Sequence, residues 1–216
     1  MTELLVRRTE DFELTGRGDA AAWNDAPWVD LVRVGSGAAA YKTRAKVMYS
    51  PTGVYVLADC EDKILTADMT KDFDLLFTQD VVEVFLWPEP SQWTYFEYEI
   101  SPLDVELPLM VVNSGGPFNG WLPFNYGGLG RVRHATAVRG GERKPFANID
   151  GWSCEMHIPY SLLRGLQNTQ PTSGTLWRAN IYRIDYDNTP ASQWAWCPDT
   201  DWNFHDFRKF GTWRFE

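Results

Sequence analysis

The chain has 216 residues, of which 44% are hydrophobic, 15% aromatic and 23% charged, and its formal net charge is −9. This length and apolar content suffice for a sizeable core and exclude a disordered chain. The negative charge disfavours binding to nucleic acid or to an anionic membrane, and it suits a neutral ligand or a cation. No internal repeat or linker interrupts the sequence, which predicts a single domain over residues 1–216.

Three widely spaced cysteines, Cys60, Cys154 and Cys197, do not indicate a disulfide framework or a zinc site. Cys60 and Cys154 fall on apolar strand faces, where we expect them to be buried. No apolar stretch reaches the length of a membrane span. Residues 1–16 lack the apolar core of a signal peptide, so we expect a cytoplasmic protein unless a signal has been removed.

Most of the chain alternates apolar and polar residues over short segments, as strands buried on one face do. Residues 3–15 read as a mixed lead-in, and residues 20–30 are rich in turns. Segments 61–77 and 101–128 read as loops, and segment 191–206 as a loop or a broken strand. The predicted strands span residues 43–50, 54–60, 80–87, 93–100, 132–138, 152–158, 175–187 and 210–215. With no helix longer than a turn, the pattern predicts an all-β, two-sheet antiparallel β-sandwich with long loops.

Residues 80–100 carry the clearest alternation and predict an antiparallel hairpin around a short loop that contains two prolines. Its core face is aliphatic and aromatic, formed by Val82, Val84, Leu86, Phe96, Tyr98 and Ile100. The other face mixes rings with carboxylates and is predicted to be open, with Glu83, Phe85, Trp87, Trp93, Tyr95, Glu97 and Glu99. Rings beside carboxylates suit a ligand with apolar C–H faces and many hydroxyl groups, such as a sugar.

Several short motifs occur in a recognisable order. They are Gly18-Asp19 with Trp23, Lys46–Tyr49, Gly53–Val56, Asp80–Phe85, Gly151–Pro159, Gly174 with Asn180-Ile181, and Lys209–Gly211. In this order and spacing the chain resembles the family 9 carbohydrate-binding modules, whose fold belongs to the DOMON-like β-sandwiches. The resemblance runs almost from end to end, but residues 101–145 match poorly.

The resemblance implies non-catalytic carbohydrate binding, with a mono- or oligosaccharide held between two facing rings and by carboxylate and other polar groups. Phe77 and Phe204 stand at the two ring positions, and Glu83 matches the family's ligand-bonding glutamate. Glu97 and Tyr182 stand where the family has an arginine and a glutamine. The predicted ligand-binding residues are Phe77, Glu83, Glu97, Tyr182, Arg183, Trp202, Phe204 and His205.

The resemblance also implies calcium, and it allows a periplasmic or secreted location. No clear motif assigns the calcium ligands, although Asp59, Glu61 and Asp62 form an acidic cluster that could equally be a solvated turn.

Other interpretations remain open at this level. Glu83, Glu97 and Glu99 could supply the acid/base pair of a glycoside hydrolase, in which carboxyl separations of about 5 to 9 Å are needed. Haem binding is a further alternative, through Met48, Met69 or Met110 with His157 or His205. The aromatic residues could instead serve a protein interface.

Several of these residues also have purely structural interpretations. Glu83 could pair with Arg183 or Lys46. Trp93 and Tyr95 could pack on residues 101–128. Trp152 and Trp177 lie on apolar strand faces, where we expect them in the core.

Overall fold

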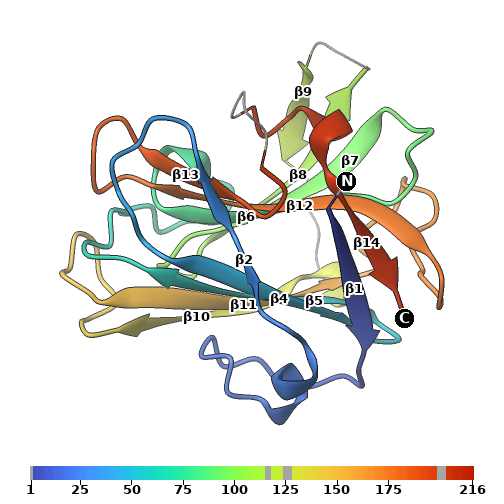
Figure 1. Cartoon of the computed structure of the whole chain (residues 1–216), viewed down its shortest axis with the longest axis horizontal. Coiled ribbons are helices and arrows are strands. Elements are labelled where there is room, and N and C mark those ends of the chain that lie inside the picture. The colour runs from blue at the N-terminus through green and yellow to red at the C-terminus, as the bar shows by residue number, and fades with distance from the viewer. Residues whose placement is uncertain (1, 115–117, 124–127, 199–202) are drawn as a thin grey trace.

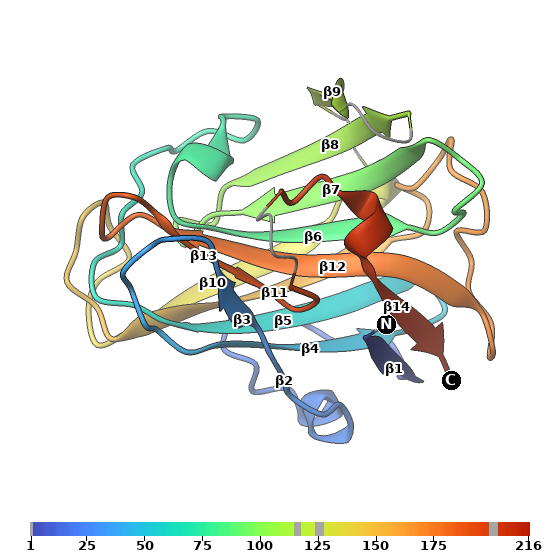
Figure 2. The same cartoon turned by 45° about the horizontal axis from the view of Figure 1, so that its top comes forward.

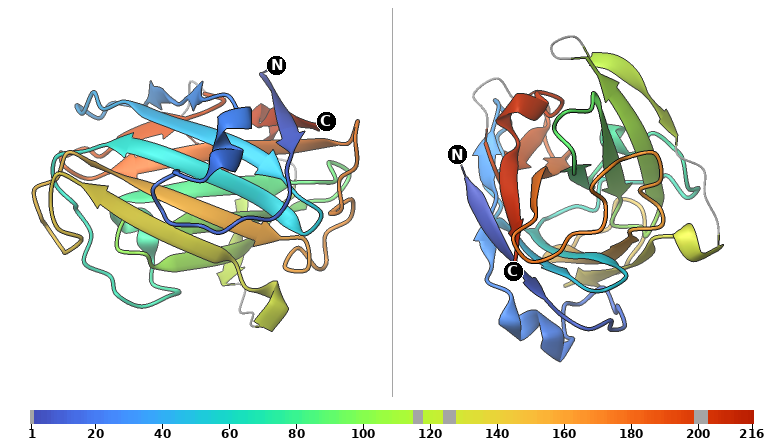
Figure 3. Two further views of the ribbon diagram at one scale, coloured as in Figure 1. Left: turned by 90° about the horizontal axis from the view of Figure 1, so that it is seen from below. Right: turned by 90° about the vertical axis from the view of Figure 1, so that its right-hand side faces the viewer.

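The computed structural model describes residues 2–114, 118–123, 128–198 and 203–216 (Figure 1). Two twisted β-sheets pack face to face and form a β-sandwich (Figures 2 and 3). The β4–β5 sheet contains β10 (Arg133–Arg139), β11 (Gly151–Pro159), β5 (Gly53–Glu61), β4 (Thr43–Tyr49) and β2 (Val29–Asp30). The β6–β7 sheet contains β14 (Gly211–Phe215), β12 (Leu176–Asp185), β6 (Val81–Trp87), β7 (Thr94–Ile100), β8 (Glu106–Asn113), β9 (Phe118–Pro123), β13 (Ser192–Ala195) and β3 (Val32–Val34).

Strand β1 (Glu3–Arg8) joins the two sheets at one edge. Its first residues pair in parallel with β14, and Arg7 and Arg8 pair in parallel with β4. The sequence predicted a mixed lead-in here, because a strand that changes sheets does not keep one buried face. The other strand pairs of the described chain are antiparallel, as predicted.

Helical structure in the described chain is limited to four 3₁₀ turns, as the sequence predicted. They are η1 (Ala21–Asp25), η2 (Leu76–Thr78), η3 (Gly128–Gly130) and η4 (Phe207–Lys209). No described helix is long and apolar enough to cross a membrane.

The main core lies between the two sheets and confirms the predicted hairpin. Strands β6 and β7 pair with Val82 opposite Ile100 and Val84 opposite Tyr98. These four side chains are fully buried in one cluster with the predicted core residues Trp152 and Trp177. Cys60 and Cys154 are buried free thiols in the same cluster, as expected.

Residues 9–28 cover the outer face of the β4–β5 sheet. Hydrogen bonds to one buried carboxylate hold this segment on the sheet. Glu155 on β11 is fully buried and accepts hydrogen bonds from the backbone amides of Thr15 and Gly16 and from the indole of Trp23. Gly16 has a φ of +79°, and a Cβ atom there would come within 2.6 Å of the Thr136 backbone. The segment therefore needs both this carboxylate and a residue without a side chain.

Much of the outer face of the β6–β7 sheet is covered, contrary to the prediction of an open face. Tyr95 is 1% exposed and Glu99 is fully buried. Tyr95 belongs to a second apolar cluster on this face, which includes Phe85 on β6, Leu109 on β8 and Phe210. A segment distant in sequence, residues 203–210, packs on Phe85 and Tyr95 and covers this part of the face (Figure 2).

The predicted irregular segment 101–128 instead contains two strands. Strand β8 pairs with β7 along its whole length, and β9 pairs with β8. Residues that indicated a loop lie within these strands. Pro108 lies within β8, and Gly120, with a φ of +118°, lies within β9. The pairing of β8 with β9 changes register between Val112 and Asn113, close to Gly120.

Candidate functional site

A pocket of about 500 Å³ opens on the outer face of the β6–β7 sheet. Strands β6 and β7 supply its floor, while η2, β9 and residues 203–205 supply its walls. The described residues that line it are Phe77, Glu83, Glu97, Glu99, Leu109, Trp121, Ile184, Gln193, Asn203, Phe204 and His205. The volume is within the range of small-ligand sites in proteins.

Three aromatic side chains contribute partly exposed rings to the pocket. Phe77 on η2 and Trp121 on β9 meet edge to face, with ring centroids 6.3 Å apart. Phe204 stacks on Tyr182 of β12, with centroids 4.0 Å apart and planes inclined by 13°. Because Tyr182 covers one face of Phe204, this ring is held in a fixed orientation at the pocket wall.

Hydrogen bonds from the sheet hold the chain around Phe204 in place. The Tyr182 hydroxyl donates to the Phe204 carbonyl at 3.2 Å, and the Asn113 amide donates to the His205 carbonyl at 2.7 Å. The Tyr95 hydroxyl and His205 Nδ1 are 2.7 Å apart. Burial lowers the pKa of His205 to about 4, so this side chain is neutral at physiological pH.

The floor of the pocket consists of three carboxyl groups from neighbouring strands. Glu83 on β6 lies directly opposite Glu99 on β7, and Glu97 lies two residues before Glu99 on the same face. One oxygen of each lies within 4.8 Å of the others. All three side chains are almost completely buried, with exposures of 2%, 3% and 0% for Glu83, Glu97 and Glu99.

This burial changes the acidity of the three groups. Burial raises the pKa of Glu83 to about 8. Burial, together with repulsion from Glu83, raises the pKa values of Glu97 and Glu99 well above the usual range of a glutamate. The Phe77 backbone amide offsets part of this effect at Glu99 without forming a full hydrogen bond. The pocket floor therefore binds protons near neutral pH when no other cation is present.

Five of the predicted site residues line this one pocket, namely Phe77, Glu83, Glu97, Phe204 and His205. Tyr182 lies behind it, under Phe204. Trp202 lies outside the described residues. The sequence did not assign Trp121 to the site, because Trp121 lies in the segment that was interpreted as irregular. Glu99 was placed on the face expected to suit a sugar, but it was not among the predicted ligand-binding residues.

The prediction for Arg183 is wrong. Arg183 pairs with Val82 across β12 and β6, so its side chain lies on the core face, and Tyr182 lies on the face of Glu83. It is fully buried between the sheets. The alternation along β12 assigns residues 182 and 183 to opposite faces, and this signal was present in the sequence. Lys46 does not pair with Glu83 either, since its ammonium group donates to the Trp23 carbonyl on the other sheet.

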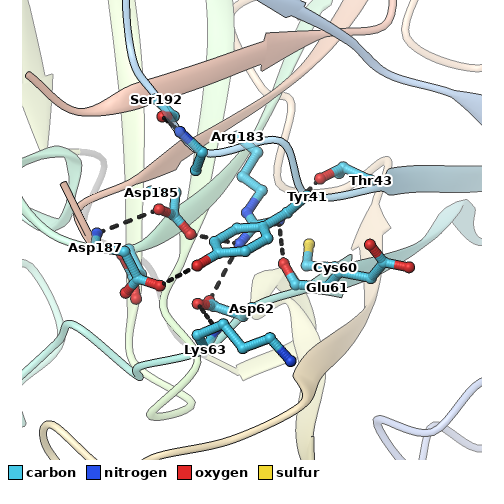
Figure 4. A network of polar contacts seen from close by, with 12 residues as sticks. Tyr41, Thr43, Cys60, Glu61, Asp62, Lys63, Arg183, Asp185, Asp187 and Ser192 are labelled. Carbon is cyan, nitrogen blue, oxygen red and sulfur yellow. Dashed lines mark hydrogen bonds and ion pairs between the residues drawn. The ribbon is translucent and has the colours of Figure 1, made fainter.

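Arg183 instead forms the centre of a buried ion network between the two sheets (Figure 4). Its Nη2 atom lies 3.1 Å from Asp62 and 2.7 Å from Asp185, and its Nη1 atom donates to Thr43 and to the Glu61 carbonyl. One guanidinium faces several carboxylates here. The pKa of Asp62 is raised to about 7, mainly by burial. The charge of Arg183 lowers this pKa, and the charge of Asp185 raises it further.

The calcium ion that the family resemblance implies can be tested against these residues. Asp59 is paired with Arg44 and Arg139, so Asp59, Glu61 and Asp62 do not converge. A different set does converge, because Asp62, Asp185 and Asp187 each bring an oxygen within 4.8 Å.

These oxygens already have partners within the chain. Arg183 holds Asp62 and Asp185, while the hydroxyls of Tyr41 and Thr66 donate to Asp187. The guanidinium provides the positive charge at this place, so the set does not offer calcium a free group of ligands.

The remaining candidates lie elsewhere. Trp93 is 57% exposed and does not line the pocket, whereas Tyr95 is buried beneath it. For haem, His157 lies on the β4–β5 sheet with Nε2 3.0 Å from the Thr52 hydroxyl, while His205 lies on the other sheet beside Tyr95. Met48, Met69 and Met110 pack against three different apolar clusters. This arrangement does not favour a haem held by one Met and one His.

The fold is a two-sheet β-sandwich, and a pocket lined by aromatic and acidic residues lies on the outer face of one sheet. Residues 14–117, just under half of the chain, match the family described as carbohydrate family 9 binding domain-like. Over these residues the chain is similar to the family 9 carbohydrate-binding modules. A sequence search among curated proteins finds no match.

Solved structures resemble the chain over nearly its whole length. A protein of Bacteroides uniformis, to which carbohydrate binding is ascribed, has a TM-score of 0.78 at 18% identity, covering 100% of this chain and 99% of that one. A family 9 carbohydrate-binding module of Caldicellulosiruptor kristjanssonii in complex with cellotriose has a TM-score of 0.69 at 17% identity, covering 100% and 94%. A structure with glucose from that organism gives 0.66 at 16% identity, covering 98% and 95%. At these identities the likeness establishes the fold.

Proposed function

We propose that this chain binds carbohydrate without catalysis, in the pocket on the outer face of the β6–β7 sheet. The observation that carries the proposal is the convergence of aromatic rings and carboxyl groups on one cavity. Phe77, Trp121 and Phe204 come from three separate segments, yet all three line it together with Glu83. Rings cover the C–H faces of a sugar, and carboxylates accept hydrogen bonds from its hydroxyls.

Two further facts support the proposal. The chain shares its fold with structures that contain cellotriose and glucose. The rings are also held before any ligand binds, since Tyr182 stacks under Phe204 and the Tyr186 hydroxyl donates to the Phe77 carbonyl at 2.8 Å. A site that is already ordered loses less entropy on binding.

Glycoside hydrolysis by the same carboxyl groups is less well supported. Retaining enzymes need carboxyl groups about 5 to 5.5 Å apart and inverting enzymes about 6.5 to 9.5 Å apart, on either side of the scissile bond. Here one oxygen from each of the three groups lies within 4.8 Å of the others, and all three groups lie on one face. This spacing leaves little room for a glycosidic bond between them.

Titration calorimetry with glucose, cellotriose and other oligosaccharides tests the proposal. Phe204→Ala should weaken the binding of any sugar that binds by roughly 5-fold, the equivalent of about 1 kcal/mol for one ring contact. Trp93→Ala is the matched control, because Trp93 is an exposed ring outside the pocket.

Sustained release of product from oligosaccharides or aryl glycosides, lost in Glu83→Gln, would overturn the non-catalytic assignment. Equal effects of the two aromatic substitutions on affinity would place the binding site elsewhere.

A further inference from the structure

The pocket floor has three acidic groups, and two of them, Glu97 and Glu99, have oxygens without a hydrogen-bond donor from the described chain when they are ionised. Neither oxygen of Glu99 receives a hydrogen bond from the described chain, and the same holds for Oε2 of Glu97. Both side chains are more than nine-tenths buried, and both line the cavity. A buried polar atom without a partner costs free energy, so these oxygens are oriented towards something that the folded chain does not itself supply.

No described side chain that lines the pocket carries a positive charge to compensate them. The lining contains no Lys or Arg among the described residues, and His205 is neutral at physiological pH. Arg183 lies on the opposite face of β12, where Asp62 and Asp185 hold it. Apart from the protons that the carboxyl groups themselves bind, the positive charge that matches this floor must therefore come from the ligand.

The geometry of the floor matches an ammonium group. An ammonium has three N–H donors and no acceptor, and the floor offers three carboxyl groups. Two oxygens that each accept from one nitrogen at about 2.8 Å can be at most about 5.6 Å apart. The observed limit of 4.8 Å meets this condition.

A divalent metal ion matches the floor less well. Calcium takes six to eight oxygen ligands, which usually include backbone carbonyls. Strands β6 and β7 are interior strands, and each pairs with a neighbour on both sides, so their carbonyl groups are engaged in the sheet. The three carboxyl groups complete the set for an ammonium but not for calcium.

We propose that the ligand of this pocket is an amino sugar, whose protonated amino group lies among Glu83, Glu97 and Glu99 while its ring packs against Phe77, Trp121 and Phe204. The inference rests on the proposed sugar site and specifies the class of sugar. The aromatic rings contact the C–H faces, which every pyranose has. The three carboxyl groups distinguish a charged amine from a hydroxyl or an acetamide at the same position.

Three trisaccharides with the same linkage test this directly, namely triglucosamine, cellotriose and tri-N-acetylglucosamine. They are compared by calorimetry at about pH 6, where the amines carry protons. We expect triglucosamine to bind at least about 10-fold more tightly than either neutral trisaccharide, as charge-assisted hydrogen bonds to buried carboxylates require.

Glu97→Gln should reduce the affinity ratio of triglucosamine to cellotriose to near one, and Glu99→Gln should do the same. Glu13→Gln should leave this ratio unchanged, because the Glu13 side chain is 97% exposed and lies outside the pocket. Thermal melting confirms that each variant is folded before its ratio is interpreted.

The outcomes separate this inference from the proposed function. Equal affinities for the three trisaccharides overturn the inference and leave carbohydrate binding intact, whereas no binding of any sugar overturns both. Cyclohexylamine binding as tightly as triglucosamine would show that the pocket recognises an amine without a sugar. Binding of cellotriose only when calcium is added, and its loss with EDTA, would assign the floor to a metal ion. Either of these last two results overturns the inference.

Discussion

Replacing Glu83 by glutamine should stabilise the protein at alkaline pH, although it removes a group from the proposed binding site. Glutamine has nearly the same shape as glutamate and carries no charge. Burial raises the pKa of Glu83 from 4.5 to about 8. The folded protein therefore holds a proton on Glu83 between these two values, whereas the unfolded chain has released it.

The sign of the pH dependence follows from this difference. Below about pH 4.5 the group is neutral in both states and contributes no difference. As the pH rises towards 8 the unfolded state is increasingly favoured, and a pKa difference of this size costs on the order of 5 kcal/mol of unfolding free energy. Glutamine removes this cost but leaves a buried amide whose hydrogen bonds are incomplete, worth about 1 to 3 kcal/mol.

We therefore expect a net gain of about 2 to 4 kcal/mol at pH 8, which corresponds to a rise in Tm of roughly 4 to 16 °C for a chain of this size. Near pH 4.5 only the cost of the incompletely bonded amide remains, so Glu83→Gln should be less stable than the wild type by about 1 to 3 kcal/mol. Thermal melts of the wild type, Glu83→Gln and the exposed control Glu13→Gln at the two pH values measure both differences. A Glu83→Gln protein that melts lower than the wild type at pH 8 would refute the reasoning, since it would mean that Glu83 is ionised and paired.

The remaining predictions concern other parts of the molecule. Arg183→Leu should lower the free energy of unfolding by about 3 to 5 kcal/mol, because it leaves Asp62 and Asp185 buried without their cation. The loss should be smaller at pH 5 than at pH 8, since protonation neutralises these carboxylates. Equal losses at both pH values, measured by urea unfolding, would contradict this prediction. Glu155→Ala should lower the free energy of unfolding by about 3 kcal/mol or more, because three donors lose their acceptor. It should also speed hydrogen exchange of the backbone amides of residues 9–28, and unchanged exchange there would contradict the role of Glu155. Trp121→Ala should weaken sugar binding about as much as Phe204→Ala, and a calorimetric titration in which only Phe204→Ala weakens binding would remove Trp121 from the site.

The sequence predicted the strands that keep one buried face throughout. The alternation in β6 and β7 predicted both the pairing and the faces, because each face of this hairpin keeps one environment along its length. Val82 and Ile100, for example, pair with each other and lie in the core. The same rule failed at β1, which changes sheets, and at β8 and β9, where Pro108 and Gly120 resemble loop residues. Pairing with a neighbouring strand outweighed local propensity in these segments.

The site could be predicted in part. The family resemblance identified Phe77 and Phe204, which lie far apart in the sequence and meet at one pocket. Burial of Glu97 and Glu99 could not be predicted, since the segments around them, η2 and residues 203–205, meet at this pocket only in the folded chain. The error at Arg183 was avoidable, because strand alternation already assigned it to the core face.

Mapping the binding site by nuclear magnetic resonance tests the central claim most directly. Cellotriose and triglucosamine are titrated into isotopically labelled protein, and the amide shifts are followed. Carbohydrate binding in the pocket on the β6–β7 sheet predicts that the largest changes occur at Phe77, Glu83, Glu97 and Phe204 and at the Trp121 indole, which surround one cavity. Changes confined to the β4–β5 sheet around His157, or no change with either sugar, would contradict it.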